Sequence, residues 1–240
     1  MAYALVVHWG GFLGTSGGTS DAIDTTGADL LVVAVHENGY AGGTVPTDSE
    51  GNTWHALTLS RMNYDSSQVT FFYADNAVVG ATHTFSYVRD NAYPSMSIQA
   101  FSGSLTASTP VDQENGATGF GDAAQNTGSV TPSENNELIV AAICMNGAFT
   151  DLAIDLGFAI QDEFGTSSYT GGSAYLIQTD LGAVNPEFTW TTTRNAAAAI
   201  ATFKAAAAAG ISVGVQSRSG IHGMLRGLSR GVACLLFLLL

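Results

Sequence analysis

The stretch Ala28–Val35, ADLLVVAV, is an unbroken apolar run of strand-forming residues between turn formers. Its length is typical of a buried strand, because a helix usually needs a longer run. Asn136–Ile143, NELIVAAI, repeats the pattern: in both stretches an acid followed by Leu enters the apolar run after an approach rich in Thr, Ser, Asp and Asn. The two stretches therefore predict the central strands of two related halves.

Further segments repeat in the same order. The additional matches are Val69–Asp75 with Ser173–Thr179, Phe85–Tyr87 with Phe188–Trp190, and Ser97–Phe101 with Ala199–Phe203. Together with the first pair, the partners are offset by 108, 104, 103 and 102 residues, so the order is kept while loops shorten. This pattern predicts an internal duplication, with pseudo-repeats at about residues 20–103 and 129–204.

The composition favours strands and tight turns. The 240 residues are 46% hydrophobic and include 28 glycines, while charged residues make up only 11%, below the usual share of about 25%. We predict an all-β, antiparallel β-sandwich of jelly-roll-like type over residues 1–205. Residues 206–240 form a separate C-terminal tail rich in Gly, Arg and Leu.

Two segments are ambiguous on local grounds. Asn195–Ala209, NAAAAIATFKAAAAA, would be a helix by propensity, but its repeat partner contains Tyr93-Pro94 and alternating serines. We therefore predict a strand at Ala197–Lys204 and leave Ala205–Ala209 open. Gly103–Gly128 is poor in large apolar residues, and it is interpreted as two edge strands joined by the GATGFG turn, with an interdomain linker as the alternative.

Charge is divided unevenly along the chain. The net charge of −13 comes from a body, residues 1–210, with 20 acidic and four basic residues and a net charge of −16, and from a tail with a net charge of +3. An acidic body repels nucleic acids and anionic membranes, so neither is an expected partner. No stretch approaches the ~20 apolar residues of a membrane-spanning helix.

The tail combines regularly spaced glycines and serines with three arginines and ends in CLLFLLL. It is too short to bury a core of its own, so it is ordered by a partner or by its own oligomer, or it is disordered. The candidate assembly residues are Arg218, Arg226, Arg230, Leu235, Leu236 and Phe237.

The N-terminal segment Met1–Gly11 lacks the features of a secretory signal. A composition typical of exported proteins without such a signal is expected of a virion protein released by lysis, although a leader missing from the sequence would give the same pattern. We therefore expect a virion or extracellular location.

Several motifs resemble a widespread, largely uncharacterised family of bacterial and phage β-sandwich modules. They are DAIDTTGADLLVVAV at 21–35, DSEGNTWHAL at 48–57, AFSG at 100–103, PVDQENGA at 110–117, SVTPSENNELIVAA at 129–142 and AVNPEFTW at 183–190. The resemblance covers about residues 20–205 and implies a concanavalin- or jelly-roll-like sandwich in which the two halves share two sheets. It supplies no catalytic residue, and the tail departs from the pattern.

No catalytic constellation is recognisable in the sequence. The five histidines form neither an HxH nor an HExxH pattern, and no GxSxG motif occurs. The adjacent acids Asp162 and Glu163 would point to opposite faces of a strand, which does not suit a glycosidase pair. We therefore predict a protein that is not an enzyme and needs no cofactor.

Carboxylates in two loops are candidates for a calcium site, because this hard cation prefers several oxygen ligands. They are Asp21 and Asp24 before the first signature strand, and Asp48 with Glu50 in a turn. Neither group has EF-hand spacing, and Asp is also an ordinary turn residue.

Aromatic residues fall into two groups. Those at strand positions are expected in the core: Trp54, Tyr73, Tyr87 and Trp190. Those at loop positions could stack on a sugar ring or dock a partner: Tyr40, Tyr93 and Tyr169 are the candidates.

The favoured hypothesis is a non-enzymatic structural or adhesive protein, a bacteriophage virion component such as a fibre, decoration or host-attachment subunit. It would form a homo-oligomer through its tail and contact other virion or surface proteins. The alternative is a carbohydrate-binding module of a secreted or surface bacterial protein, with glycans as partners. A hydrolase using a distant acid pair is a third hypothesis.

Overall fold

The computed structural model describes residues 2–38, 44–58, 62–64, 67–90, 92–104, 109–166 and 169–206. Every regular element in this part of the chain is a β-strand, and all strand pairs are antiparallel. The predicted all-β sandwich is therefore confirmed.

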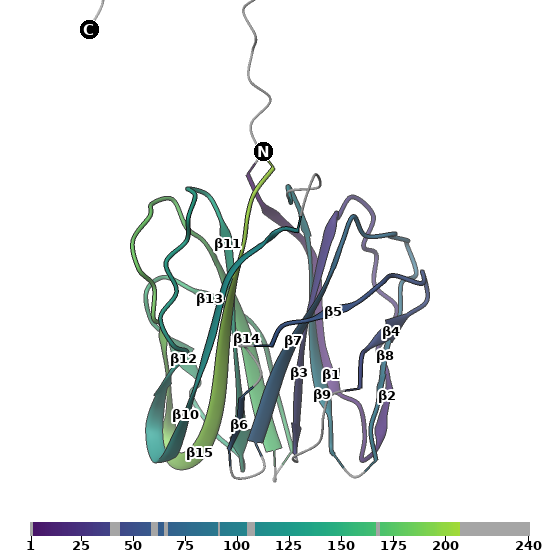
Figure 1. Ribbon diagram of the computed structural model, residues 1–240. Coiled ribbons are helices and arrows are strands. Elements are labelled where there is room, and N and C mark those ends of the chain that lie inside the picture. The colour runs from purple at the N-terminus through teal and green to yellow at the C-terminus, as the bar shows by residue number, and fades with distance from the viewer. Residues whose placement is uncertain are drawn as a thin grey trace, which may run out of the picture. The chain divides into compact units, whose positions relative to one another are not determined.

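The first half of the chain forms one six-stranded sheet (Figure 1). Its strands, in spatial order, are β1 (Ala4–Phe12), β9 (Ser95–Ser102), β3 (Leu30–Asn38), β7 (Ser67–Asp75) and β5 (His55–Ala56), with β6 (Met62–Tyr64) also pairing with β7. A separate three-stranded sheet contains β2 (Gly17–Thr19), β8 (Phe85–Val88) and β4 (Thr47–Asp48).

The second half of the chain forms the other six-stranded sheet. Its strands are β10 (Val111–Asn126), β15 (Glu187–Phe203), β11 (Leu138–Asn146), β14 (Tyr169–Ile177) and β13 (Ala159–Gly165), with β12 (Ala153–Ile154) also pairing with β15. Each half thus builds its own sheet, rather than both halves contributing strands to two shared sheets. The reason is that β3 pairs with β7 and β9, and β11 with β14 and β15, all within the same half.

The two six-stranded sheets follow the same scheme. In each, the first long strand of the half lies at an edge, the last lies next to it, and the signature strand comes third. The registers also correspond, since Leu30 lies opposite Phe101 and Leu138 opposite Phe203. This is the arrangement that a duplication would produce, and the duplication itself stays a prediction.

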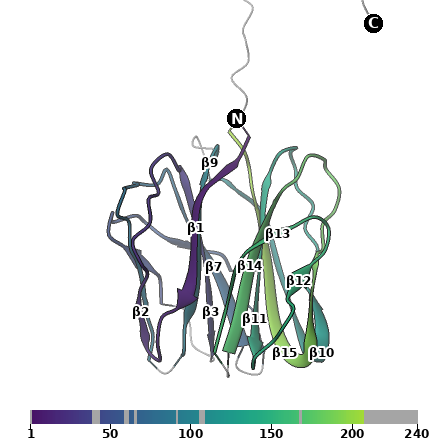
Figure 2. The ribbon, with the colours of Figure 1, turned by 180° about the vertical axis from the view of Figure 1, so that it is seen from behind.

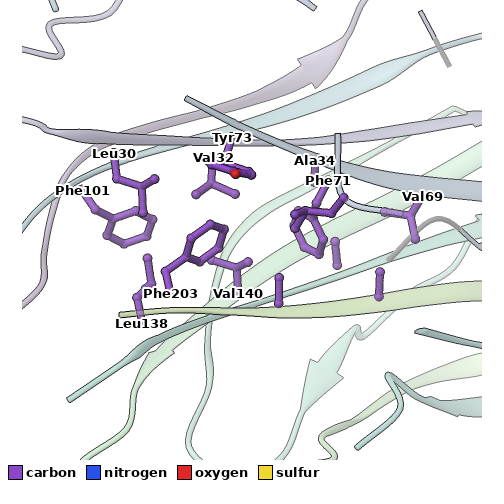
Figure 3. Close-up of a cluster of buried hydrophobic side chains, with 14 of the residues drawn as sticks. Leu30, Val32, Ala34, Val69, Phe71, Tyr73, Phe101, Leu138, Val140 and Phe203 are labelled. Carbon is purple, nitrogen blue, oxygen red and sulfur yellow. The ribbon is translucent and has the colours of Figure 1, made fainter. Parts of the chain in front are cut away.

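Three apolar clusters hold the layers together. One lies between the two six-stranded sheets, where Leu30, Val32 and Phe101 face Leu138 and Phe203 (Figure 3). A second joins the outer face of the first sheet to the three-stranded sheet, and a third covers the outer face of the second sheet. Both central strands are therefore buried on both faces, which explains why their sequences are continuously apolar instead of alternating.

The alternating pattern of β8 has a different origin. Phe85 and Tyr87 are buried against the first sheet, while Thr84 and Ser86 are partly exposed. All four aromatic residues expected in the core, Trp54, Tyr73, Tyr87 and Trp190, are at most 9% exposed. The inner and outer faces of these strands were thus readable from the sequence.

The predicted edge hairpin at Gly103–Gly128 is correct in its edge position and in the fold-back at GATGFG, but its two arms pair with β15 and not with each other. Val111–Asn126 is one long strand that pairs with β15 from end to end. Its register shifts between Gly119 and Asp122 and again before Ala124, and Gly121 has a φ of +70°. The glycine-rich GATGFG segment therefore folds the strand back on itself through irregular pairing, and Asn115 Nδ2 donates a hydrogen bond of 2.8 Å to the Ser129 carbonyl.

The alanine-rich segment is a strand, as predicted. Residues 197–203 belong to β15, and Lys204 follows the strand end. Ala197, Ala199 and Ala201 lie in the cluster between the sheets, and the alternate alanines face the outer cluster. Packing against partners on both faces outweighs the helix propensity of alanine here.

Small residues allow the two sheets to approach closely. A Cβ atom at Gly10 of β1 would lie 2.6 Å from the Asp162 Cβ of β13, and one at Gly171 would lie 2.8 Å from the His36 ring. These strands lie on the side of the sandwich seen in Figure 2. The seam between the sheets therefore has no room for larger side chains at these positions.

We expect Gly10→Ala to destabilise the sandwich by about 1–3 kcal/mol, because the added methyl group must push β1 away from β13. Urea denaturation monitored by fluorescence would measure the change in the free energy of unfolding. Gly182→Ala is the control, since its added Cβ meets only the carboxylate of Asp180 at 3.1 Å. If Gly10→Ala and Gly182→Ala are equally stable, the close approach of β1 to β13 is contradicted.

Candidate functional site

The chain enters and leaves the sandwich at one end (Figure 1). The Tyr3 hydroxyl donates a hydrogen bond of 2.7 Å to the Lys204 carbonyl, and the Ala206 amide donates one of 2.8 Å to the Gly103 carbonyl. The opposite end carries the C-terminal end of β3 and the N-terminal ends of β9 and β14. Residues 3 and 206 therefore lie at one end of the sandwich, and these three strand ends lie at the other.

Two of the three aromatic ligand candidates meet at that opposite end. Tyr93 precedes β9 and Tyr169 begins β14, so one comes from each half of the chain. Their rings stack with centroids 5.7 Å apart and an interplanar angle of 30°. Asn38 Nδ2 donates a hydrogen bond to the Tyr169 hydroxyl, and Tyr93 is 38% exposed. We refer to Tyr93 and Tyr169 as the tyrosine pair.

The backbone of Tyr93 is strained. Its φ is +47°, a region that bulky residues with a Cβ rarely adopt. Its amide donates a hydrogen bond of 3.0 Å to the Thr15 carbonyl, and the Pro94 carbonyl accepts one of 2.9 Å from Leu13. These bonds hold the strained loop in place, and strain of this kind is concentrated at functional sites.

A buried ion pair supports the same loop. Glu37 accepts hydrogen bonds from the Arg89 guanidinium, from the Tyr87 hydroxyl at 3.0 Å and from Gln68 Nε2 at 2.7 Å. The Asn38 amide, next in the chain, donates to the Ala92 carbonyl at 2.8 Å. The end of β3 therefore fixes the segment that carries Tyr93.

A surface hollow of about 290 Å³ lies at the turn between β13 and β14. Its lining includes Phe149, Glu163, Phe164, Thr166 and Thr170. Thr166 Oγ1 accepts a hydrogen bond of 3.1 Å from the Tyr169 amide, so the hollow and the tyrosine pair share this turn. The hollow could not be predicted from the sequence, because nothing in the sequence shows that Phe149 lies near Phe164.

Of the calcium candidates, Asp48 is engaged in hydrogen bonds within the protein. Its side chain is fully buried and accepts hydrogen bonds from Trp54 Nε1 at 2.7 Å and from the Glu50 amide at 2.9 Å, with His83 Nε2 at 3.0 Å. Asp21 accepts a bond from Trp9, and Asp24 closes a turn by accepting one from the Thr26 amide. No group of three or more His, Cys, Asp or Glu side chains in the described ranges could hold a metal ion.

Asp48, His83 and Thr25 form a line that resembles a catalytic triad. His83 Nε2 faces Asp48, and His83 Nδ1 lies 2.9 Å from Thr25 Oγ1. Thr25 and His83 have no exposed surface, so no substrate can reach the hydroxyl. Thr25 also exchanges hydrogen bonds with the Gly80 backbone, and the line therefore joins three loops.

A second polar group links the two sheets. His8 Nδ1 lies 2.9 Å from Asp162 Oδ1, and Ser97 Oγ donates to Asp162 Oδ2 at 2.5 Å. Ser97 also contacts the Ser173 hydroxyl. Ser97 is bonded to the carboxylate and not to the imidazole, so this arrangement does not activate a serine as a nucleophile. As expected of neighbours on a strand, Asp162 is buried while Glu163 is exposed.

Several predicted residues lie outside the described part of the chain. They are Tyr40 and the assembly candidates Arg218, Arg226, Arg230, Leu235, Leu236 and Phe237.

Comparison with known proteins gives no match to a protein-family model, to a curated protein or to a solved structure. The resemblance to bacterial and phage sandwich modules therefore stays a prediction. None of the described residues belongs to a helix long and apolar enough to cross a membrane.

We expect Asp48→Asn to lower the free energy of unfolding by about 3 kcal/mol at pH 7, because the amide cannot serve all the donors around Asp48. Burial alone would raise the pKa of Asp48, but hydrogen bonds from His83, Trp54 and Asn52 outweigh it and hold the pKa below its ordinary value. The stabilisation by the carboxylate is therefore present at neutral pH and lost as the pH falls through the native pKa.

Urea denaturation of the wild type and of Asp48→Asn at pH 7 and pH 3 would test this. The difference between them should shrink in acid. Asp24→Asn, at an exposed turn position, is the control and should leave the stability almost unchanged. If Asp48→Asn is as stable as the wild type, the buried carboxylate does not contribute to stability.

His36 makes the seam between the sheets sensitive to acid. Its side chain is 2% exposed and packs edge-to-face on Phe164 at a centroid distance of 4.7 Å. Burial lowers the pKa of His36 from 6.5 to about 4. Between these values the unfolded chain is protonated and the native chain is not, so stability falls as the pH decreases, by about 3 kcal/mol in total.

We expect His36→Leu to remove this contribution, which denaturation between pH 7 and pH 4 would reveal as a shallower dependence of stability on pH. Identical slopes for the wild type and His36→Leu would show that His36 does not set the acid sensitivity.

Proposed function

We propose that this protein is a non-enzymatic structural or attachment protein that forms a homo-oligomer, with a virion component as the setting that fits its sequence best. The observation that carries the proposal is the polarity of the sandwich. Both chain connections lie at one end, while the strained, partly exposed tyrosine pair lies at the other. A module of this kind can be fastened at one end and present the other.

The layered core supports this role. Both six-stranded sheets are covered on both faces by apolar clusters, which makes the sandwich a stiff spacer between its ends. The acidic body and the basic tail have complementary charges, so the tail of one copy can bind the body of another. Such contacts weaken as salt screens them.

The alternative function, a carbohydrate-binding module, is favoured by the tyrosine pair and the hollow beside it. The two functions are compatible, because an attachment protein needs both a fastened end and a recognition surface.

We expect the full chain to be a defined oligomer and a chain ending at Ala209 to be a monomer, as measured by multi-angle light scattering. Replacing Arg218, Arg226 and Arg230 by Gln should shift the full chain toward monomer, and 1 M salt should do the same. Circular dichroism of the shortened chain would verify that the sandwich stays folded. If the full chain and the chain ending at Ala209 are both monomers, assembly through the tail is overturned. If salt does not change the oligomer, the role of the arginines is overturned.

A further inference from the structure

We propose that the tyrosine pair and the adjoining hollow form a binding site for an uncharged glycan chain. This inference deepens the proposed attachment role and rests on it, because it names the class of ligand that the presented end would recognise.

The shape and chemistry of the site suit a sugar. A pyranose ring has a flat face of C–H groups that packs on an aromatic ring, while its hydroxyls require polar partners at the edge. Tyr93 supplies a partly exposed ring, and Phe149 and Phe164 supply aromatic surface in the hollow. Glu163 lines the same hollow with a carboxylate that can bond to sugar hydroxyls, and Thr170 Oγ1, which donates to the Gly147 carbonyl at 2.7 Å, can in addition accept a hydrogen bond.

The site is preorganised. Tyr93 is held at a φ of +47° by backbone hydrogen bonds, and the Glu37–Arg89 ion pair ties its loop to β3. Tyr169 stacks on Tyr93 and is itself bonded to Asn38. A tyrosine whose position is already fixed loses little conformational entropy when a ligand binds. The strained backbone of Tyr93 is therefore explained if it holds the ring in its binding position.

The charge of the protein around the site favours an uncharged ligand. Glu163 is the charged residue that lines the hollow, while Arg194 lies beside it and donates a hydrogen bond of 3.0 Å from Nε to the Ala148 carbonyl. Residues 1–210 have a net charge of −16. Against a body of this net charge an anionic polysaccharide would meet repulsion, whereas a neutral chain would not.

The test uses the labelled full chain on an array of neutral and acidic bacterial, plant and animal glycans, followed by titration with the best soluble ligand. We expect binding to neutral glycans. Tyr93→Asn should weaken it about tenfold or more, because Asn tolerates the positive φ but removes the ring. Tyr93→Phe keeps the ring and should bind within about threefold of the wild type.

Phe120→Ala is the matched control, since Phe120 is a 66% exposed aromatic residue on β10, at the opposite edge of the second sheet from β13. It should leave binding unchanged. The proposal is overturned if no neutral glycan binds, if acidic glycans bind preferentially, or if Tyr93→Asn binds like the wild type. Light scattering of the same samples reports assembly separately, so a wild-type chain that forms the oligomer but binds no glycan would refute this site and not the assembly of the protein.

Discussion

The structure depends on the burial of both faces of β3 and β11. Each of these strands lies in the middle of a sheet that packs on the other sheet through one face and on its own outer layer through the other. Because all side chains of such a strand leave water, the strand contributes apolar burial at every residue. The glycines and alanines at the seam then determine how closely the sheets approach, and this distance determines which polar groups from the two halves can meet.

Polar groups are placed where the packing leaves room for them, and each joins segments that are distant in sequence. Asp48, His83 and Thr25 tie loops of the first half together, and His8 and Asp162 tie one sheet to the other. Both groups resemble parts of catalytic machinery in their residue types. Their burial and bonding partners give them a structural role instead, because a nucleophile needs both access to substrate and a hydrogen bond to the imidazole.

The end of the sandwich that carries the tyrosine pair combines rigidity with exposure. Tyr93 is contributed by the first half and Tyr169 by the second, so the pair exists only when the two sheets are packed in register. A ligand bound there would contact residues from both halves, so it would bind the assembled sandwich and not either half alone. Residues 3 and 206 lie at the other end of the sandwich.

The sequence by itself determined the all-β class, the two buried central strands, the inner face of β8 and the strand at the alanine-rich segment, because these follow from patterns within a few consecutive residues and from the repeat. It also singled out Tyr93 as a loop aromatic, whereas Tyr169, predicted in a loop, is the first residue of β14. Only the tertiary structure decided that these two rings stack, that Phe149 and Phe164 share a hollow, that Asp48 is enclosed by donors, and that both arms of the GATGFG fold-back pair with β15. These features depend on how segments tens to hundreds of residues apart pack and pair, and no local pattern records which of them will meet.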